Sequence, residues 1–336
     1  MTGTPGTESE VLAAHLREQA TEFLRSLRLH REATTDARGA EEALAAARAL
    51  RRAARRLSAA LHTFRPLLDA EWAAALRPEL AWLSGTLAQE HAYASRLSRL
   101  LDALHRLSGP SALPGPAAPE GGTRGDKRGT APRGLTVGAA KAAALLERQL
   151  TLARTRAHST ALQALGSSRF HAVADSVAVL ASEVPLSGCA DDLKPLAAQA
   201  ESDLAEAVAA LPLGQAGHPY NAEALTHGLA AETAPDTQDA PWLTVRSLLR
   251  LHRYAQEVLL GHVPPEPRLA DASRALDLHR EAAAAASAAA QAARTPRIAP
   301  ATAYALGVLH ADQRHEVEAA RFSFQRAWQH EPVSAG

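Results

Sequence analysis

The stretch LAAARALRRAARRLSAAL, residues Leu44–Leu61, carries the strongest structural signal in this chain. Its leucines are expected to lie on one side of a helix and to face a core, at Leu44, Leu50, Leu57 and Leu61. Its arginines recur at helical spacing on the opposite side, at Arg48, Arg51, Arg52, Arg55 and Arg56. Like charges three and four residues apart repel each other. The helix therefore either exposes this arginine stripe to solvent or binds an anion with it.

The rest of the chain is also rich in helix-forming residues, and it contains no β-branched run of strand length. This composition predicts an all-α fold. The apolar periodicity predicts helices at residues 8–30, 40–65, 70–107, 137–165, 168–182, 190–211, 239–262, 268–293 and 301–330. The segment from Ser108 to Gly134 is rich in Pro and Gly, so we expect a flexible loop there.

Composition and charge weigh against several classes of protein. The 36 basic residues balance the 36 acidic residues, whereas a domain that binds nucleic acid over its whole surface is usually strongly basic. The single cysteine, Cys189, excludes an internal disulfide framework. Neither a signal peptide nor an apolar run of about 18 residues that could cross a bilayer is visible. We therefore expect a cytoplasmic protein that has no membrane partner.

A weak internal repeat links the arginine stripe to a second basic helix. The sequence WLTVRSLLRLHRYAQEVL, residues Trp242–Leu259, aligns Arg246 with Arg51 and Arg250 with Arg55. Arg253 shares the face of the other two arginines of this helix. This repeat predicts two related helical units whose basic helices face each other.

The run RALRRAARRLSAALHTFRPLLDAEW, Arg48–Trp72, resembles the signature helix of CHAD domains, the conserved-histidine α-helical domains. The residues in register with that signature are Arg51, Arg55, Arg56, Leu57, Leu61, Phe64 and Asp69. Further similar segments are Glu79–Glu90, Ser167–Val173, Val245–Leu259, Leu276–Glu281 and Ala305–Trp328. The chain departs from the family pattern where Arg48 and Leu243 stand at the signature histidine positions. It therefore resembles a divergent member.

The resemblance implies one CHAD-like domain at residues 8–331, built from two pseudo-symmetric antiparallel helical bundles. Its N-terminal half would span residues 8–185, with the flexible loop at 108–134, and its C-terminal half would span residues 188–331. Residues 1–7 would be a disordered N-terminus, and residues 332–336 a C-terminal tail. The family binds inorganic polyphosphate in a basic groove between the two bundles and often accompanies triphosphate-handling enzymes. A triphosphate-handling enzyme is therefore a candidate partner.

The candidate polyphosphate-binding residues come from both basic helices and from a segment that matches a histidine-containing motif of the family. They are Arg51, Arg55, Arg56, Arg246, Arg250, Arg253, His279, Arg280, Arg48 and Arg52. Arg48 and Arg52 match no basic position of the family pattern. His279 could donate to a phosphate or satisfy a buried polar contact, and Arg280 could bind phosphate, pair with Glu281 or face solvent. Arginine is suited to phosphate because its planar, permanently charged fork matches phosphate oxygens.

The leading hypothesis is non-catalytic binding of polyphosphate or a similar polyanion. The alternative is a divergent helical scaffold that has lost this ligand and serves in protein–protein interaction. Nucleic-acid binding ranks third, because the chain has few aromatic residues on which bases could stack. We find no metalloprotease motif, no phosphate-binding loop of the Walker type and no nucleophile elbow. We therefore expect no metal site, no cofactor and no enzymatic activity.

Overall fold

The computed structural model describes residues 8–35, 39–109, 133–187, 192–217, 235–261, 264 and 266–329. Helices make up nearly all of these residues, which confirms the all-α fold; an isolated antiparallel bridge joins Leu68 to Leu186. The elements are α1 (Glu8–Thr35), α2 (Ala40–Thr63), the short 3-10 helix η1 (Arg65–Leu67), α3 (Ala70–Ser108), α4 (Arg133–Leu165), α5 (Ser168–Ser182), α6 (Leu193–Ala209), α7 (Leu213–Ala216), α9 (Pro235–Leu260), α10 (Pro267–Ala293) and α11 (Pro300–Gln329).

Most helix boundaries lie within a few residues of the predicted ones. The largest difference is at α1, which ends at Thr35 rather than residue 30; α4 begins at Arg133 rather than residue 137, and α9 begins at Pro235 rather than residue 239. A proline at the first position of a helix is favourable, because the amide that it lacks has no partner there in any case. The central part of the expected loop at 108–134, the N-terminal residues 1–7 and the tail 332–336 lie outside the described residues.

The chain forms two compact units. The first unit comprises residues 1–90, 156–211 and 244–269, and the second comprises residues 91–155, 212–243 and 270–336. This division differs from the expected halves at residues 8–185 and 188–331. The reason is that α3, α4, α9 and α10 each contribute residues to both units.

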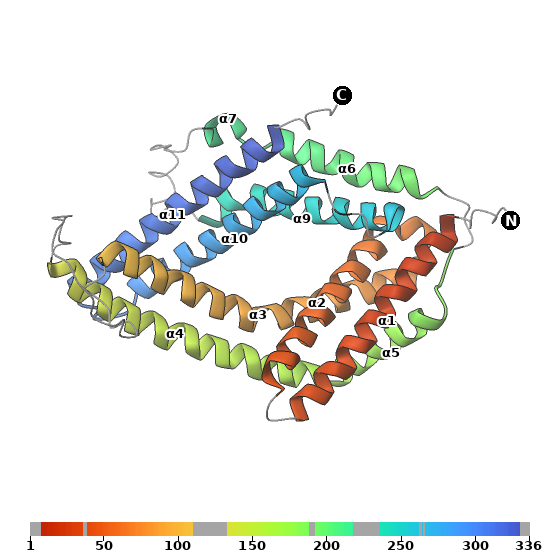
Figure 1. The fold of residues 1–336 in the computed structure, drawn as a ribbon, viewed down its shortest axis with the longest axis horizontal. Coiled ribbons are helices and arrows are strands. Elements are labelled where there is room, and N and C mark those ends of the chain that lie inside the picture. Colours follow the sequence, from red (N-terminus) through yellow and green to blue (C-terminus); the bar gives the residue numbers. More distant parts are fainter. Residues whose placement is uncertain are drawn as a thin grey trace, which may run out of the picture. The chain divides into compact units, whose positions relative to one another are not determined.

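The core of the first unit lies between the amphipathic helices α1, α2 and α5. Figure 1 shows α1 and α2 side by side, with α5 beside α1. The leucines Leu50, Leu57 and Leu61 of α2 are fully buried in this core, as expected. Leu44 was expected among them, but 39% of its surface is exposed. At 100° per residue Leu44 is rotated by about 120° from Leu50, so it leaves the line of the other three.

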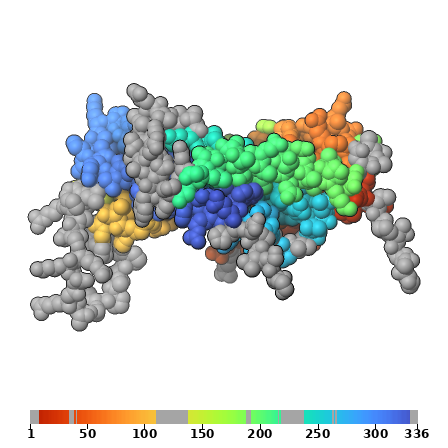
Figure 2. All heavy atoms as spheres, turned by 90° about the horizontal axis from the view of Figure 1, so that it is seen from above, coloured from red at the N-terminus to blue at the C-terminus, as the bar shows by residue number. Residues whose placement is uncertain are grey.

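Helix α6 shows the same amphipathic division at the surface of the first unit. Its buried residues recur every three or four positions, at Leu193, Ala197, Ala200, Leu204 and Val208. The residues between them are mostly exposed. Figure 2 shows α6, in green, as a band on the surface of the molecule. Its polar face therefore supplies acidic side chains to the surface of the first unit.

The core of the second unit is built mainly from alanine and leucine. The alanines Ala285, Ala289 and Ala292 of α10 are fully buried together with Leu306 and Leu309 of α11. Small side chains let neighbouring helices approach closely. At Gly138 of α4 the approach is so close that an added Cβ would overlap the carbonyl oxygen of Ala301 at the start of α11.

Candidate functional site

A basic pocket of about 480 Å³ lies in the first unit, between α2, α3 and α9. Its lining residues are Arg55, Ser58, Ala59, His62, Arg77, Pro78, Ala81, Ser84, Gly85, Ser247, Arg250, Leu251 and Tyr254. Three of these side chains are permanently positive and three carry serine hydroxyls, while none of the described lining residues is acidic. The pocket therefore offers an anion positive charge and hydrogen-bond donors together.

Helical spacing explains how each element reaches this pocket. On α2 the lining positions 58, 59 and 62 lie three, four and seven residues after position 55, so all four share one face. On α9 the lining positions 247, 250, 251 and 254 repeat the same spacing. Arg55 and Arg250, which the internal repeat sets in register, thus line one pocket. Of the predicted arginines, these two are the ones that the basic pocket contains.

His62 and Arg77 form a hydrogen-bonded pair at the edge of α2 and α3. The Nη1 atom of Arg77 lies 2.7 Å from Nδ1 of His62. A guanidinium can only donate, so Nδ1 must accept and the ring proton must sit on Nε2. Burial and the positive charges of Arg77 and Arg65 lower the pKa of His62, although Asp203 partly opposes them. The imidazole is therefore neutral in this pair near pH 7.

Arg56, another of the predicted phosphate-binding residues, forms an ion pair with Glu257. Its Nε donates to Oε2 of Glu257 at 2.6 Å, and its guanidinium lies 5.6 Å from the ring centre of Tyr254. Burial lowers the pKa of Arg56, but the hydrogen bond and charge of Glu257 outweigh burial and raise it. Arg56 thus links α2 to α9 beside the basic pocket and does not line it.

The remaining predicted arginines of the first unit lie outside the basic pocket. Arg48 and Arg52 are exposed, whereas Arg51 and Arg246 are partly buried. Arg253 lines a second pocket of about 300 Å³. That pocket also contains the carboxylates of Glu201, Glu257 and Glu266, which makes it a poor site for phosphate.

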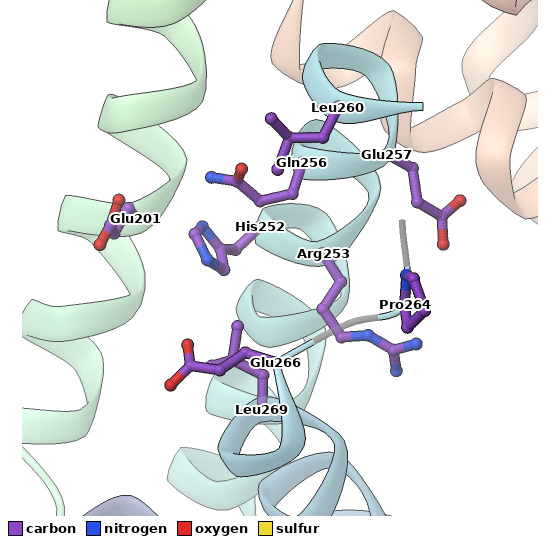
Figure 3. Close-up of a pocket in the computed structure, with 9 residues that line it drawn as sticks. All are labelled: Glu201, His252, Arg253, Gln256, Glu257, Leu260, Pro264, Glu266 and Leu269. Atoms are coloured by element: carbon purple, nitrogen blue, oxygen red, sulfur yellow. The ribbon is translucent and has the colours of Figure 1, made fainter. Parts of the chain in front are cut away.

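Figure 3 shows that the side chains around this second pocket point in two directions from α9. His252 and Gln256 point toward Glu201 on α6, while Arg253 and Glu257 point to the other side of the helix. His252 is buried, and burial lowers its pKa, with Glu201 and Glu266 acting in the opposite direction. Arg253 therefore lines the second pocket, whereas Arg250, three residues before it, lines the basic pocket.

His279 and Arg280 belong to the second unit. Only 1% of His279 is exposed, and its ring stacks on Trp242 with 5.7 Å between ring centres. Its Nε2 lies 3.3 Å from Oδ1 of Asp239. Burial lowers the pKa of His279, although Asp239 opposes this change. Of the two roles considered for His279, the geometry supports the buried polar contact.

Arg280 lies near two other polar groups of the second unit. Its Nη2 is 3.5 Å from Oε1 of its neighbour Glu281, and the guanidinium is partly exposed. Burial lowers the pKa of Arg96, and the positive charge of Arg280 lowers it further, whereas Tyr93 acts in the opposite direction. The guanidinium of Arg96 lies 5.3 Å from the ring centre of Tyr93. The second unit thus brings two arginines, Arg96 and Arg280, close together.

Sequence reasoning missed four residues that shape these sites: Arg77, His62, Tyr254 and Arg96. Arg77 and Arg96 belong to no stripe of basic residues, so their spacing carries no signal. His62 lies inside the matched signature segment, between Leu61 and Phe64, and its position seven residues after Arg55 could have marked it.

Within the described ranges, no three His, Cys, Asp or Glu side chains are grouped closely enough to hold a metal ion. No helix among the described residues is long and apolar enough to span a membrane.

Comparison with known proteins identifies relatives of the whole chain. The family model of the CHAD domain matches residues 18–277. The solved structure of PptA from Streptomyces chartreusis is similar, with 62% sequence identity and a TM-score of 0.79. The similarity covers 96% of this chain and 99% of that one. No curated protein matches the sequence.

Proposed function

Because the chain belongs to the CHAD domain family, we propose that it binds inorganic polyphosphate, or a similar phosphate-rich polyanion, in the basic pocket. CHAD domains are known to bind polyphosphate. The observation that carries the proposal is the lining itself, which holds Arg55, Arg77 and Arg250 and no acidic side chain among its described residues. Arginine forks bind phosphate oxygens by paired, charge-assisted hydrogen bonds.

The role we propose is binding rather than catalysis. The described lining offers cations and hydroxyl groups, but no carboxylate that could act as a general base or hold a metal ion for phosphoryl transfer. Its volume of about 480 Å³ falls within the usual range of small-ligand sites. We place this activity in the cytoplasm. A triphosphate-handling enzyme is the class of protein partner that the family resemblance implies.

The alternative function is a helical scaffold that has lost its phosphate ligand. Two observations favour it: Arg56 is engaged by Glu257, and His279 is buried in an ionic network. We favour polyphosphate binding because Arg55 and Arg250 line one pocket together with Arg77, and no described lining residue of that pocket is acidic.

The test compares the double variant Arg55→Glu/Arg250→Glu with the wild type in binding long-chain polyphosphate at pH 7.5. Removing two charge-assisted contacts, each worth about 1.5–3 kcal/mol, should weaken binding by about 100-fold or more. Arg52→Glu is the matched control, because Arg52 is an exposed arginine of the same helix outside the pocket. Its affinity should stay within about threefold of the wild type.

Two results would contradict the proposal. Absence of binding by the wild type at low salt would favour the scaffold. Equal loss of affinity in the double variant and in Arg52→Glu would mean that charge anywhere on the surface matters and that the pocket is not the site. Circular dichroism of each variant should show unchanged helix content, which separates loss of the site from loss of the fold.

A further inference from the structure

The hydrogen bond between Arg77 and His62 holds a guanidinium of the basic pocket on a neutral imidazole. The inference that follows rests on the proposed function, because it concerns how this pocket binds phosphate. Both side chains line the pocket together with Arg55 and Arg250. Arg77 already uses one of its N–H groups on Nδ1 of His62. That N–H group is therefore not available to a ligand while the imidazole is neutral.

The charges around His62 come from every helix packed near it. Arg55 lies on α2 and Arg65 on η1, while Arg77 lies on α3 and Arg250 on α9. The acidic neighbour is Asp203 of α6. Tyr254 also lines the pocket. Burial together with Arg77 and Arg65 keeps the pKa of His62 below its ordinary value of 6.5. The empty pocket therefore disfavours the imidazolium.

A phosphate in the pocket reverses this balance. Its negative charge stabilises an imidazolium nearby and reduces the repulsion from the surrounding arginines. Protonation of Nδ1 turns this atom from an acceptor into a donor, so the hydrogen bond from Arg77 must break. The Nη1 group of Arg77 and the new Nδ1–H group can then both donate to phosphate oxygens.

We propose that His62 and Arg77 form a proton-dependent part of the phosphate site, in which binding of phosphate is coupled to uptake of one proton by His62. Linkage makes this coupling reciprocal: if phosphate favours the protonated ring, protonation favours phosphate by the same factor. Affinity is lowest above the pKa that His62 has in the complex. It rises as the pH falls through that value, and it levels off below the pKa of the free protein.

The size of the effect follows from the same relation. Each unit by which phosphate raises the pKa of His62 increases the affinity at low pH by about tenfold. We therefore expect the wild type to bind at least about threefold more tightly at pH 5.5 than at pH 8. Other histidines of the first unit, such as the exposed His171 on α5, do not line the pocket and should not contribute.

The experiment uses cyclic trimetaphosphate as the probe, because it has no terminal phosphate that titrates in this range. Isothermal titration calorimetry at pH 5.5 and pH 8, in two buffers with different heats of ionisation, gives both the affinity and the number of protons taken up. The informative variant is His62→Asn, whose amide oxygen can accept from Arg77 near the position of Nδ1 but cannot be protonated. Compared with itself at the two pH values, this variant should lose the increase in affinity at pH 5.5. His171→Asn is the control and should keep the increase.

The outcomes separate this inference from the proposed function. If neither trimetaphosphate nor long-chain polyphosphate binds the wild type at either pH, the proposed function itself fails. If the wild type binds with equal affinity at both pH values, or His62→Asn keeps the full pH dependence, the proton coupling is wrong and the pocket still binds phosphate. NMR titration of the ring gives a direct check, since the pKa of His62 must rise when trimetaphosphate is added.

Discussion

Asp239 is the residue on which the buried charges of the second unit depend. Its Oδ2 accepts from Nη1 of Arg314 at 2.8 Å, and its Oδ1 accepts from Nη2 of Arg321 at 2.7 Å. Both arginines are buried, and Glu318 supplies a second carboxylate to Arg321 at 2.8 Å. A buried charge that loses its partner is strongly destabilising. Asp239 therefore stabilises the fold, although it is not among the residues that line the basic pocket.

We expect Asp239→Asn to lower the free energy of unfolding by about 3–5 kcal/mol, because it leaves two buried guanidinium groups with too little negative charge. Denaturant unfolding followed by circular dichroism measures this loss. Asp271→Asn is the matched control, since Asp271 forms an exposed ion pair with Arg274 on the surface of α10. Its cost should stay below about 1 kcal/mol. Equal costs for the two variants would show that burial of the Asp239 network contributes nothing.

The same carboxylate predicts how stability depends on pH. Burial would raise the pKa of Asp239, but His279 and Arg314 outweigh burial and lower it from 3.8 to about 2. A carboxyl whose pKa is lower in the folded state than in the unfolded chain stabilises the fold at every pH above its unfolded pKa. This contribution disappears as the pH falls from about 4 toward 2. The shift corresponds to roughly 2 kcal/mol. In urea unfolding at pH 6 and pH 2.5, Asp239→Asn should lack this part of the wild-type pH dependence.

At the scale of residues, the sequence predicted the members of a repeated pattern and missed single side chains. Arg55 and Arg250 could be found because helical spacing and an internal repeat both marked them. The ion pair of Arg56 with Glu257 joins positions 201 residues apart, and no local pattern records such a contact. His62 and Arg77 come together from two helices in the same way. Spacing shows which face of a helix a residue occupies, but it does not show what lies opposite.

At the scale of elements, the close approach of α4 and α11 makes Gly138 a sensitive position. Glycine within a helix usually costs about 0.5–1 kcal/mol relative to alanine. At Gly138 the added Cβ would overlap the carbonyl oxygen of Ala301, so the clash should exceed this gain. We expect Gly138→Ala to lower the melting temperature. A core that is overpacked by one methyl group typically loses about 1–3 kcal/mol.

Gly307→Ala is the control for this prediction. Gly307 lies inside α11, and nothing is within 4 Å of the place where its Cβ would stand. The change should therefore raise stability by about 0.5–1 kcal/mol. Differential scanning calorimetry should show shifts of opposite sign for the two variants. A gain in both would mean that α4 and α11 separate easily at Gly138.

Helix positions were well predicted because the chain is rich in helix-forming residues and several helices, such as α2 and α9, carry a clear apolar period. The exceptions have local causes. Leu44 was placed on the buried side by similarity of residue type, although its spacing rotates it away from Leu50. The starts of α4 and α9 were placed too late because glycine and proline were read as loop residues, whereas Pro235 opens α9.

At the scale of the whole molecule, the salt dependence of the binding constant reports how many cationic side chains contact a polyphosphate chain. Three arginines line the basic pocket. With about 0.7 counterions released per neutralised phosphate of a single-stranded polyanion, the slope of log K against log salt should be roughly −2 at pH 8. Binding isotherms between 50 and 300 mM NaCl measure it. A slope near zero would contradict electrostatic binding, and a much steeper one would show that cations outside the pocket also take part.

The family and the all-α class could be predicted because they rest on the order and spacing of several motifs along the chain. The division into units could not. Sequence similarity between the two basic helices suggested two consecutive halves, whereas each compact unit contains pieces from three separate parts of the chain. Compactness depends on contacts between distant segments, and such contacts leave no periodic trace.

The interleaving of the two units also sets a condition on synthesis. The core around Leu12 and Phe23 of α1 is completed by Ala255 and Val258 of α9. A nascent chain must therefore grow past residue 258 before α1 can bury its apolar face fully. The N-terminal part of the first unit thus cannot complete its folding before α9 has been synthesised. Closing a loop of this length lowers the entropy of the chain before the stabilising contacts form. Until then the growing polypeptide keeps apolar surface of α1 exposed, which makes this stage of synthesis the most prone to aggregation.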